Sequence, residues 1–248
     1  VKALDDYLAN SKNADRGRIL ERMRREKVPV QLPTLTQWLK VETQATTVAT
    51  ILTALRDYPL AETRLSLESL VRNANQTSTN RIAALDLLLS DSGEDVPARL
   101  ASYVNTLEDG IVLADVLRRL GSLPRFEPGA KTIASKLQSA DAGVRAAALD
   151  ALGKLGSPLG RDAVLPALSA NDVRLRRAGA SAAGKLNMTS AIEPLLKLGA
   201  EPDVELRRAC LDSLRRLRET RAIPLAVAAL KEPRLERVAL EYLAELGS

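Results

Sequence analysis

Small and apolar residues recur at a fixed spacing in the C-terminal half of the chain. Four segments align with starts 31, 31 and 29 residues apart: 144–156, 175–187, 206–218 and 235–247. Their fourth, sixth, ninth and twelfth places hold small or apolar side chains, a spacing that puts them on one stripe of a helix. Each segment is therefore predicted to be a helix with this stripe buried, including Leu149, Leu211 and Leu240 at the sixth place.

The same template extends towards the N-terminus, with weaker matches that start at residues 109, 80, 46 and 15. A second set of apolar segments lies between these helices, several with a proline near the start or middle: 28–40, 95–104, 163–169, 191–199 and 222–231. Each unit of about 31 residues is thus predicted to be an antiparallel helix pair, whose apolar face only the neighbouring pairs can cover. The predicted fold is all-α, an α-α superhelix of about eight helical hairpins.

The C-terminal repeats are the more regular ones. Gly156, Asn187 and Gly247 end three of the four aligned copies, as expected where a residue in the left-handed conformation ends a helix. We expect residues 127–248 to form regular repeats and residues 1–126 to form divergent helical repeats, both within one continuous solenoid.

A short motif, Asp-x-x-(Val/Leu)-Arg, begins three successive repeats. It is carried by Asp141 with Arg145, Asp172 with Arg176, and Asp203 with Arg207. The motif resembles the HEAT repeat, specifically the short bacterial type also found in phycobilin lyases, which builds armadillo-like α-solenoids. In that family the Asp and Arg form a ladder between repeats, so the resemblance implies a structural role for these six residues. It implies a HEAT-like solenoid but no single activity.

Charged residues follow the same repeat, and the formal net charge is +5. An acidic residue precedes a basic one by four places in four of the helices: Glu21–Arg25, Asp115–Arg119, Asp150–Lys154 and Asp212–Arg216. This order stabilises a helix by about 0.2–0.5 kcal/mol per pair, so we interpret these charges first as paired with each other. The alternative is a positive stripe that faces a polyanion or an acidic partner.

Arginine is densest between residues 207 and 221. The aligned segments form the second helix of each pair. Their exposed side is the surface from which a solenoid would select a partner. We therefore choose five candidate partner-binding residues: Arg177, Arg208, Asp212, Arg215 and Arg237. No aromatic residue lies between residues 127 and 241, which disfavours nucleic acid because single strands bind by stacking on aromatic rings.

The composition excludes several kinds of chemistry. The chain has no histidine and one cysteine, which excludes a zinc finger, a His-based catalytic triad and an internal disulfide framework. Cys210 lies between Ala209 and Leu211 of the apolar stripe and is predicted to be a packed residue, not a reactive thiol. Since there is also no nucleophile motif and no Gly-rich phosphate-binding motif, we expect no enzyme, and no catalytic, cofactor-binding or metal-binding residue.

No apolar run approaches the roughly 20 residues that span a bilayer, and we find no secretory signal or lipid anchor. We therefore expect a soluble segment that does not bind membranes, and the compartment stays open. Because the chain begins with Val1, we expect it to be part of a longer protein.

The sequence favours a non-catalytic scaffold or spacer for protein–protein interaction. Its partner would be another protein or the neighbouring domains of a longer chain. Two alternatives remain. One is a structural module of a larger multidomain bacterial enzyme, for example beside a β-propeller or a cytochrome c domain. The other is a basic solenoid that binds nucleic acid, whose affinity would fall steeply with salt.

Overall fold

The computed structural model describes residues 13–26, 28–90, 96–123 and 129–247. Within these ranges it contains fifteen α-helices, four short 3₁₀ turns and no strand, which confirms the predicted all-α fold. No helix in the described ranges is long and apolar enough to cross a bilayer. The chain divides into two compact units, residues 1–96 (unit 1) and 97–248 (unit 2).

Unit 1 contains five described helices: α2 (Asn13–Arg25), α3 (Leu32–Val41), α4 (Ala45–Leu55), α5 (Leu60–Arg72) and α6 (Ser78–Leu88). Its core is mostly aliphatic, with the largest contribution from Trp38, which is fully buried. The guanidinium of Arg16 on α2 lies 5.8 Å from the centre of the Trp38 ring, within the range of a cation–π contact. Trp38 therefore packs in the core of unit 1.

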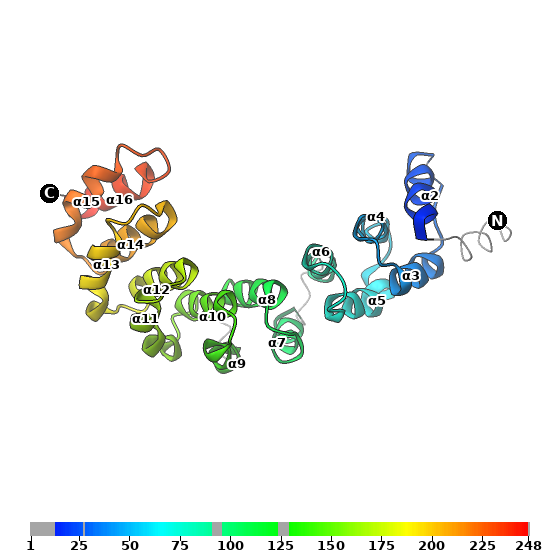
Figure 1. Cartoon of the computed structure of the whole chain (residues 1–248), viewed down its shortest axis with the longest axis horizontal. Helices are drawn as coiled ribbons and strands as arrows, with labels where there is room; N and C mark the ends of the chain where they lie inside the picture. The colour runs from blue at the N-terminus through cyan, green and yellow to red at the C-terminus, as the bar shows by residue number, and fades with distance from the viewer. Residues whose placement is uncertain (1–12, 27, 91–95, 124–128, 248) are drawn as a thin grey trace. The chain divides into compact units, whose positions relative to one another are not determined.

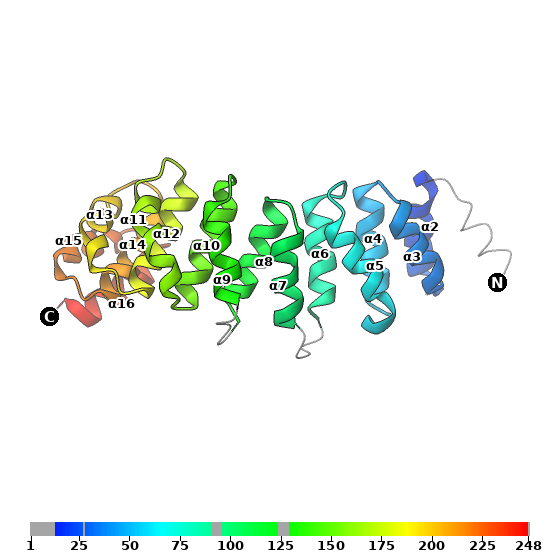
Figure 2. The same cartoon turned by 90° about the horizontal axis from the view of Figure 1, so that it is seen from below.

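Unit 2 contains two sets of helices (Figure 1). The inner helices are α8 (Ile111–Gly121), α10 (Ala142–Lys154), α12 (Val173–Lys185), α14 (Val204–Arg216) and α16 (Glu236–Leu246). The outer helices are α7 (Val96–Thr106), α9 (Ala130–Ser135), α11 (Arg161–Leu168), α13 (Ile192–Leu198) and α15 (Ile223–Ala229). The inner helices follow one another on the inside of the bend in unit 2, and α7 to α10 stand side by side across the direction of the array (Figure 2).

The repeat predicts these elements closely. All eight helices expected from the template are present, each beginning within two residues of its expected start. The five expected intervening helices are α3, α7, α11, α13 and α15, whereas α5 and α9 follow from the predicted pairing but were not assigned to a segment of the sequence. The described residues hold seven helix pairs and α2; a partner of α2 would fall in residues 1–12, outside the described ranges. The expected boundary at residues 126–127 also lies outside them, within residues 124–128.

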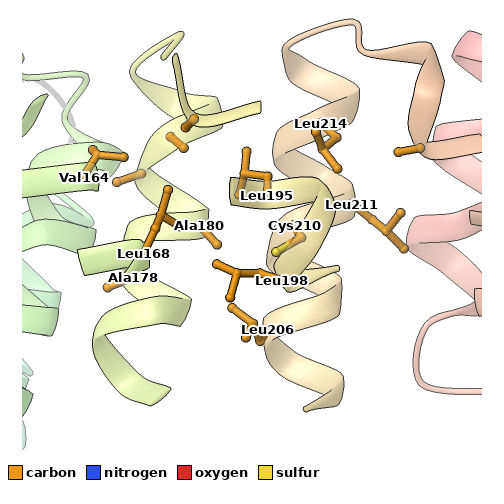
Figure 3. Packing of buried hydrophobic residues seen from close by; sticks show 14 of the residues in the cluster. Val164, Leu168, Ala178, Ala180, Leu195, Leu198, Leu206, Cys210, Leu211 and Leu214 are labelled. Atoms are coloured by element: carbon orange, nitrogen blue, oxygen red, sulfur yellow. The ribbon is translucent and has the colours of Figure 1, made fainter. Parts of the chain in front are cut away.

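The core of unit 2 is a continuous aliphatic layer between the inner and outer helices. Figure 3 shows Leu195 and Leu198 of the outer helix α13 among apolar side chains of the inner helices on either side. Cys210 lies in this layer with no exposed surface, and burial raises the pKa of its thiol to about 12. A thiol that stays protonated is a poor nucleophile, so the prediction of a packed cysteine is confirmed.

Successive inner helices make very close contacts at glycine. Each contact joins a glycine in the last turn of one inner helix to a small residue in the next: Gly121 to Ala151, Gly153 to Ala182, and Gly184 to Ser213. A Cβ on these glycines would lie only 2.4, 3.0 and 2.6 Å from the Cα of the partner. At the third contact the Ser213 hydroxyl donates to the carbonyl of Ala180 and accepts from the Gly184 N–H. The spacing of the inner helices therefore depends on the absence of a side chain at one place in each repeat.

The last pair of inner helices is built differently. Arg215 takes the place of the glycine in α14, and Tyr242 takes the place of the small residue in α16. Tyr242 is fully buried, and its hydroxyl donates to the carbonyl of Glu219. Arg215 forms ion pairs with Asp212 of its own helix and with Glu245 of α16. A large ring and an ion pair thus fill the contact that small residues make elsewhere.

One predicted core residue is exposed. Leu149 and Leu211 are 1% exposed, as predicted, but the equivalent Leu240 is 52% exposed, so the prediction for Leu240 is wrong. In Figure 3 the side chain of Leu211 points towards the following helix pair. Leu240 belongs to α16, and no helix follows α16 among the described residues, so none of them covers this face.

Helix ends α10, α12 and α14 share one geometry. Gly156, Asn187 and Arg218 each follow the helix with φ of 66°, 53° and 56°. At each end, the next N–H donates to the carbonyl five residues before it, at 2.9–3.0 Å, which is the Schellman arrangement. Two predicted ends are therefore confirmed. The left-handed end predicted at Gly247 is wrong, since its φ is −87°, and Arg218 adopts the conformation without being Gly or Asn.

The glycine contacts generate a graded prediction. Replacing Gly184 by alanine should lower the free energy of unfolding by about 1–3 kcal/mol, because α12 and α14 must move apart to admit the methyl group. Gly153→Ala should cost less, since its partner is 0.4 Å farther away, at 3.0 Å against 2.6 Å. Urea unfolding monitored by circular dichroism measures both. Helix propensity alone would raise the stability by about 1 kcal/mol, so a stabilised Gly184→Ala would contradict this account of the packing.

The helix ends generate a second prediction, with opposite signs at equivalent places. Arg218→Gly should raise the free energy of unfolding by about 1 kcal/mol, because the left-handed conformation costs a residue with a Cβ roughly that amount. Gly156→Arg should lower it by a similar amount, although nothing lies within 4 Å of the new Cβ. The midpoint of thermal unfolding checks both variants. Equal shifts of the same sign would show that the backbone conformation does not decide stability here.

Candidate functional site

The inner helices of unit 2 line one groove. It has a volume of about 890 Å³, and its lining runs from Gly110 before α8 to Glu241 on α16. We call it the inner groove. Every inner helix contributes to it. Within each helix the contributing residues recur three or four places apart, so they share one face. The groove therefore presents the same places of the repeat, one helix after another.

The lining of α10, α12, α14 and α16 is ordered in rows. A row holds residues at one place of the repeat, spaced by 31, 31 and 29 residues. The first row is Gly143, Arg174, Glu205 and Arg234; the second row is Ala146, Arg177, Arg208 and Arg237; the floor row is Ala147, Ala178, Ala209 and Val238; the third row is Asp150, Ser181, Asp212 and Glu241. Beyond the third row lie Lys185, Arg215 and Arg216. Small side chains thus occupy the floor, and charged ones stand on both sides of it.

The groove contains all five residues that the sequence selected for partner binding. Arg177, Arg208 and Arg237 form the second row, Asp212 belongs to the third, and Arg215 lies beside it. They come from three successive inner helices, α12, α14 and α16.

The groove is positively charged on balance. Its lining has nine Arg or Lys residues and five Asp or Glu residues, an excess of four positive charges. The whole chain has a formal net charge of +5. A concave surface with one excess sign concentrates the electric field and attracts the opposite charge. Three of these arginines, Arg174, Arg177 and Arg215, also pair with carboxylates that do not line the groove, so the excess that a ligand would meet is smaller than four.

The third row is neutralised by its neighbours. The carboxylate of Asp150 forms an ion pair with Lys154, at 2.9 Å, and another with Lys185 of the next repeat, at 3.4 Å. Burial alone raises the pKa of Asp150, but these two lysines outweigh it, and the pKa lies below its ordinary value. Asp212 behaves alike: burial raises its pKa, and two arginines of its own helix bring it lower.

The predicted pairing of acid and base within helices is largely confirmed. Asp115–Arg119, Asp150–Lys154 and Asp212–Arg216 are ion pairs with N–O distances of 2.6, 2.9 and 2.9 Å. On α2 the ion pair joins Arg22 to Glu26 at 2.9 Å. These charges stabilise helices first, so the excess charge of the groove comes from other residues.

The three arginines of the second row differ in how closely they are paired and in how exposed they are. Arg177 donates two hydrogen bonds to Asp203 of the next repeat. Arg208 pairs with Glu205 at 2.6 Å, and the nearest partner of Arg237, Glu241, is 3.8 Å away. The exposed fraction of the three side chains rises along the row, from 39% through 56% to 89%.

The residues to which the resemblance assigns a ladder lie near the rim of the groove. Asp141, Asp172 and Asp203 each cap the N-terminus of an inner helix and accept a backbone N–H at 2.7–2.9 Å. Such a cap contributes about 1 kcal/mol to a helix. Arg145 and Arg176 each donate to two backbone carbonyls of the loop that precedes their helix.

Contacts between repeats at this rim use further partners. Arg176 pairs with Glu201 at 3.3 Å, and Arg207 pairs with Glu232, each in the following repeat. Asp203 pairs with Arg177, which lowers the pKa of its carboxyl. Each of these ion pairs reaches from an inner helix into the loop ahead of the next inner helix. They hold neighbouring repeats in register at the rim.

Arg174 also pairs with an aspartate of the motif. It pairs with Asp172 at 2.7 Å, and its hydrogen bonds lower the pKa of that carboxyl to about 2. The charge of Asp141, one repeat earlier, also raises the pKa of Arg174. Asp172 and Asp203 are thus paired with Arg174 and Arg177, which lie two places before and one place after the motif arginine Arg176.

The groove shows no constellation for catalysis. Among the described residues, no group of three or more His, Cys, Asp or Glu side chains could hold a metal ion. Cys210 is buried in the core and does not line the groove. The chemistry that the lining offers is ion pairing and hydrogen bonding.

Sequence reasoning missed part of the lining. Arg234 and Glu205 of the first row were not selected, and neither was Arg118 of α8. Arg234 and Glu205 stand at the same place of the repeat as Arg174, so the spacing could have indicated them. Glu205 pairs with both Arg208 and Arg234, at 2.6 and 2.9 Å.

Comparison with known proteins supports the same architecture. Residues 130–214 match the family model of HEAT repeats, and the matched stretch runs from α9 to the last turn of α14. No curated protein matches the chain. One further helix pair lies on each side of the matched stretch within unit 2, α7 with α8 and α15 with α16. Residues 130–214 are therefore similar to HEAT repeats.

Proposed function

We propose that the chain is a non-catalytic interaction scaffold and that the inner groove is where it holds a protein partner. The observation that supports this most is the repeated lining. Five successive inner helices line the groove, with small residues at its floor, and the arginines and lysines beside the floor come from α8, α12, α14, α16 and the loop before α16. Solenoids use such extended concave surfaces for binding.

The groove suits a segment of polypeptide better than a small molecule. Small-molecule sites are largely apolar and enclosed, with few polar groups. Fourteen of the residues that line the inner groove are charged, and the lining runs across five helices. A lining of this length offers many weak contacts along one direction, which is how an extended segment binds.

The nucleic-acid alternative receives less support. The lining contains no aromatic residue on which bases could stack, and five carboxylates lie among the arginines and lysines. A protein that binds the phosphate backbone of a duplex would bind more tightly without these carboxylates. The module of a larger enzyme is compatible with the scaffold, since neighbouring domains would then be the partner.

A peptide library tests the proposed function. Random peptides of about twelve residues, long enough in extended form to cross about four helix layers, are displayed on phage and selected on the whole chain. The groove variant is Arg208→Glu with Arg237→Glu. The control is Lys197→Glu with Lys231→Glu, because these lysines are exposed, lie outside the groove, and change the net charge equally.

We expect peptides selected on the wild type to bind the control within about twofold and to lose at least about tenfold on the groove variant, as expected when a charge-assisted contact becomes repulsive. Binding that is equal for both variants would contradict a role for the groove. Tighter binding of a random-sequence DNA duplex than of any selected peptide, with a steep loss on added salt, would favour the nucleic-acid alternative.

A further inference from the structure

The second row sets a length scale across the groove. Arg177, Arg208 and Arg237 stand at one place of the repeat on three adjacent inner helices, α12, α14 and α16. Packed helices lie about 8–10 Å apart. The row therefore offers one guanidinium about every 8–10 Å along the direction in which the repeats follow one another.

The guanidinium groups retain donors for a ligand. An arginine has five N–H donors, and the bonds to Asp203 take two of those of Arg177. Arg208 pairs through one terminal nitrogen, and Arg237 is 89% exposed. Because exposed ion pairs are weak, a carboxylate from a ligand can join or replace the present partners.

One peptide conformation matches this length scale. A polyproline II helix has three residues per turn and rises about 3.1 Å per residue, so every third side chain lies on the same side at intervals of about 9.3 Å. In a β-strand, successive side chains alternate between faces, and residues three apart point in opposite directions. Carboxylates at every third residue of a polyproline II segment would therefore face successive arginines of the second row.

The floor of the groove is compatible with such a segment. Next to each arginine of the second row stands a small residue: Ala178, Ala209 and Val238. Short side chains leave room for the backbone of a ligand and for proline rings, and they place no competing charge beneath it. A polyproline II backbone needs no hydrogen bonds from the groove to complete a ladder, and an alanine floor provides none.

The repeat of a nucleic acid fits the row less well. Phosphates follow each other by about 3.4 Å along the axis on one strand of a duplex, which is shorter than the interval between the arginines. The charge complementarity alone would admit any polyanion. A peptide with a carboxylate at every third residue places each charge opposite an arginine, whereas about two of every three phosphates would face none.

We infer that the second row selects an acidic, proline-containing segment of a partner protein, bound in the polyproline II conformation with a carboxylate at every third residue. This inference rests on the proposed function, because it names the partner chemistry of the same groove. It adds a register that the proposed function does not require.

Two synthetic peptides of identical composition test the register. The first repeats Glu-Pro-Ala about five times, and the second has the same residues with its glutamates grouped at one end, so both favour polyproline II and have equal charge. Each is labelled with fluorescein and titrated with the whole chain at low salt, and the anisotropy is measured. The variant is Arg208→Gln, in the middle of the row. The control is Arg216→Gln on the same helix, which also lines the groove but stands beyond the third row, outside the row of regularly spaced arginines.

We expect the regularly spaced peptide to bind about tenfold more tightly than the grouped one, roughly one charge-assisted contact. Arg208→Gln should remove this preference, and Arg216→Gln should keep it. Equal binding of both peptides, lost on the Arg208→Glu and Arg237→Glu variant, would overturn the register and leave the proposed function standing. Binding of neither peptide would overturn the inference even if the phage selection succeeds. Displacement of the regular peptide by an equally charged single-stranded DNA at lower concentration would overturn it in favour of nucleic acid.

Discussion

The close approach of the inner helices is the constraint on which unit 2 depends. Glycine at one place of the repeat meets a small residue of the next inner helix at three successive contacts, from Gly121 to Ser213. Where two inner helices approach this closely, the side chains at neighbouring places must point away from the contact. They point either into the aliphatic layer or into the groove. The same packing therefore produces the buried core and the ordered rows of the lining. The last contact, which uses Tyr242 and Arg215 in place of small residues, shows that the array tolerates a different solution at its end.

Charge is organised in two layers with different roles. Pairs within a helix, such as Asp212–Arg216, and pairs across repeats, such as Arg177–Asp203, stabilise helices or hold the register between them. The excess of positive charge remains in the groove, where the arginines of the second row become more exposed along the array. We propose that a surface built in this way selects a ligand by the spacing of its charges, because each repeat would contribute one similar contact.

Most of the fold follows from the sequence, because a buried stripe in each repeat must reappear wherever a helix packs against two neighbours. The failures have local physical causes. Leu240 carries the core pattern but lies on α16, which no described helix covers. Arg218 adopts the left-handed conformation because α14 ends at the same place of the repeat as α10 and α12. At that place the other two repeats have Gly156 and Asn187. The lining of the groove was predictable only in part: the sequence indicates which residues share a place, but the contact of Arg208 with Glu205 and that of Arg177 with Asp203 depend on side-chain conformations and on neighbouring repeats.

The most direct test of the central claim is a crystal structure of the chain with the regularly spaced acidic peptide. The account predicts an extended peptide that crosses the inner helices over Ala178 and Ala209, with successive carboxylates on Arg177, Arg208 and Arg237. A peptide bound on the outer helices, or one that lies along a single inner helix, would contradict it.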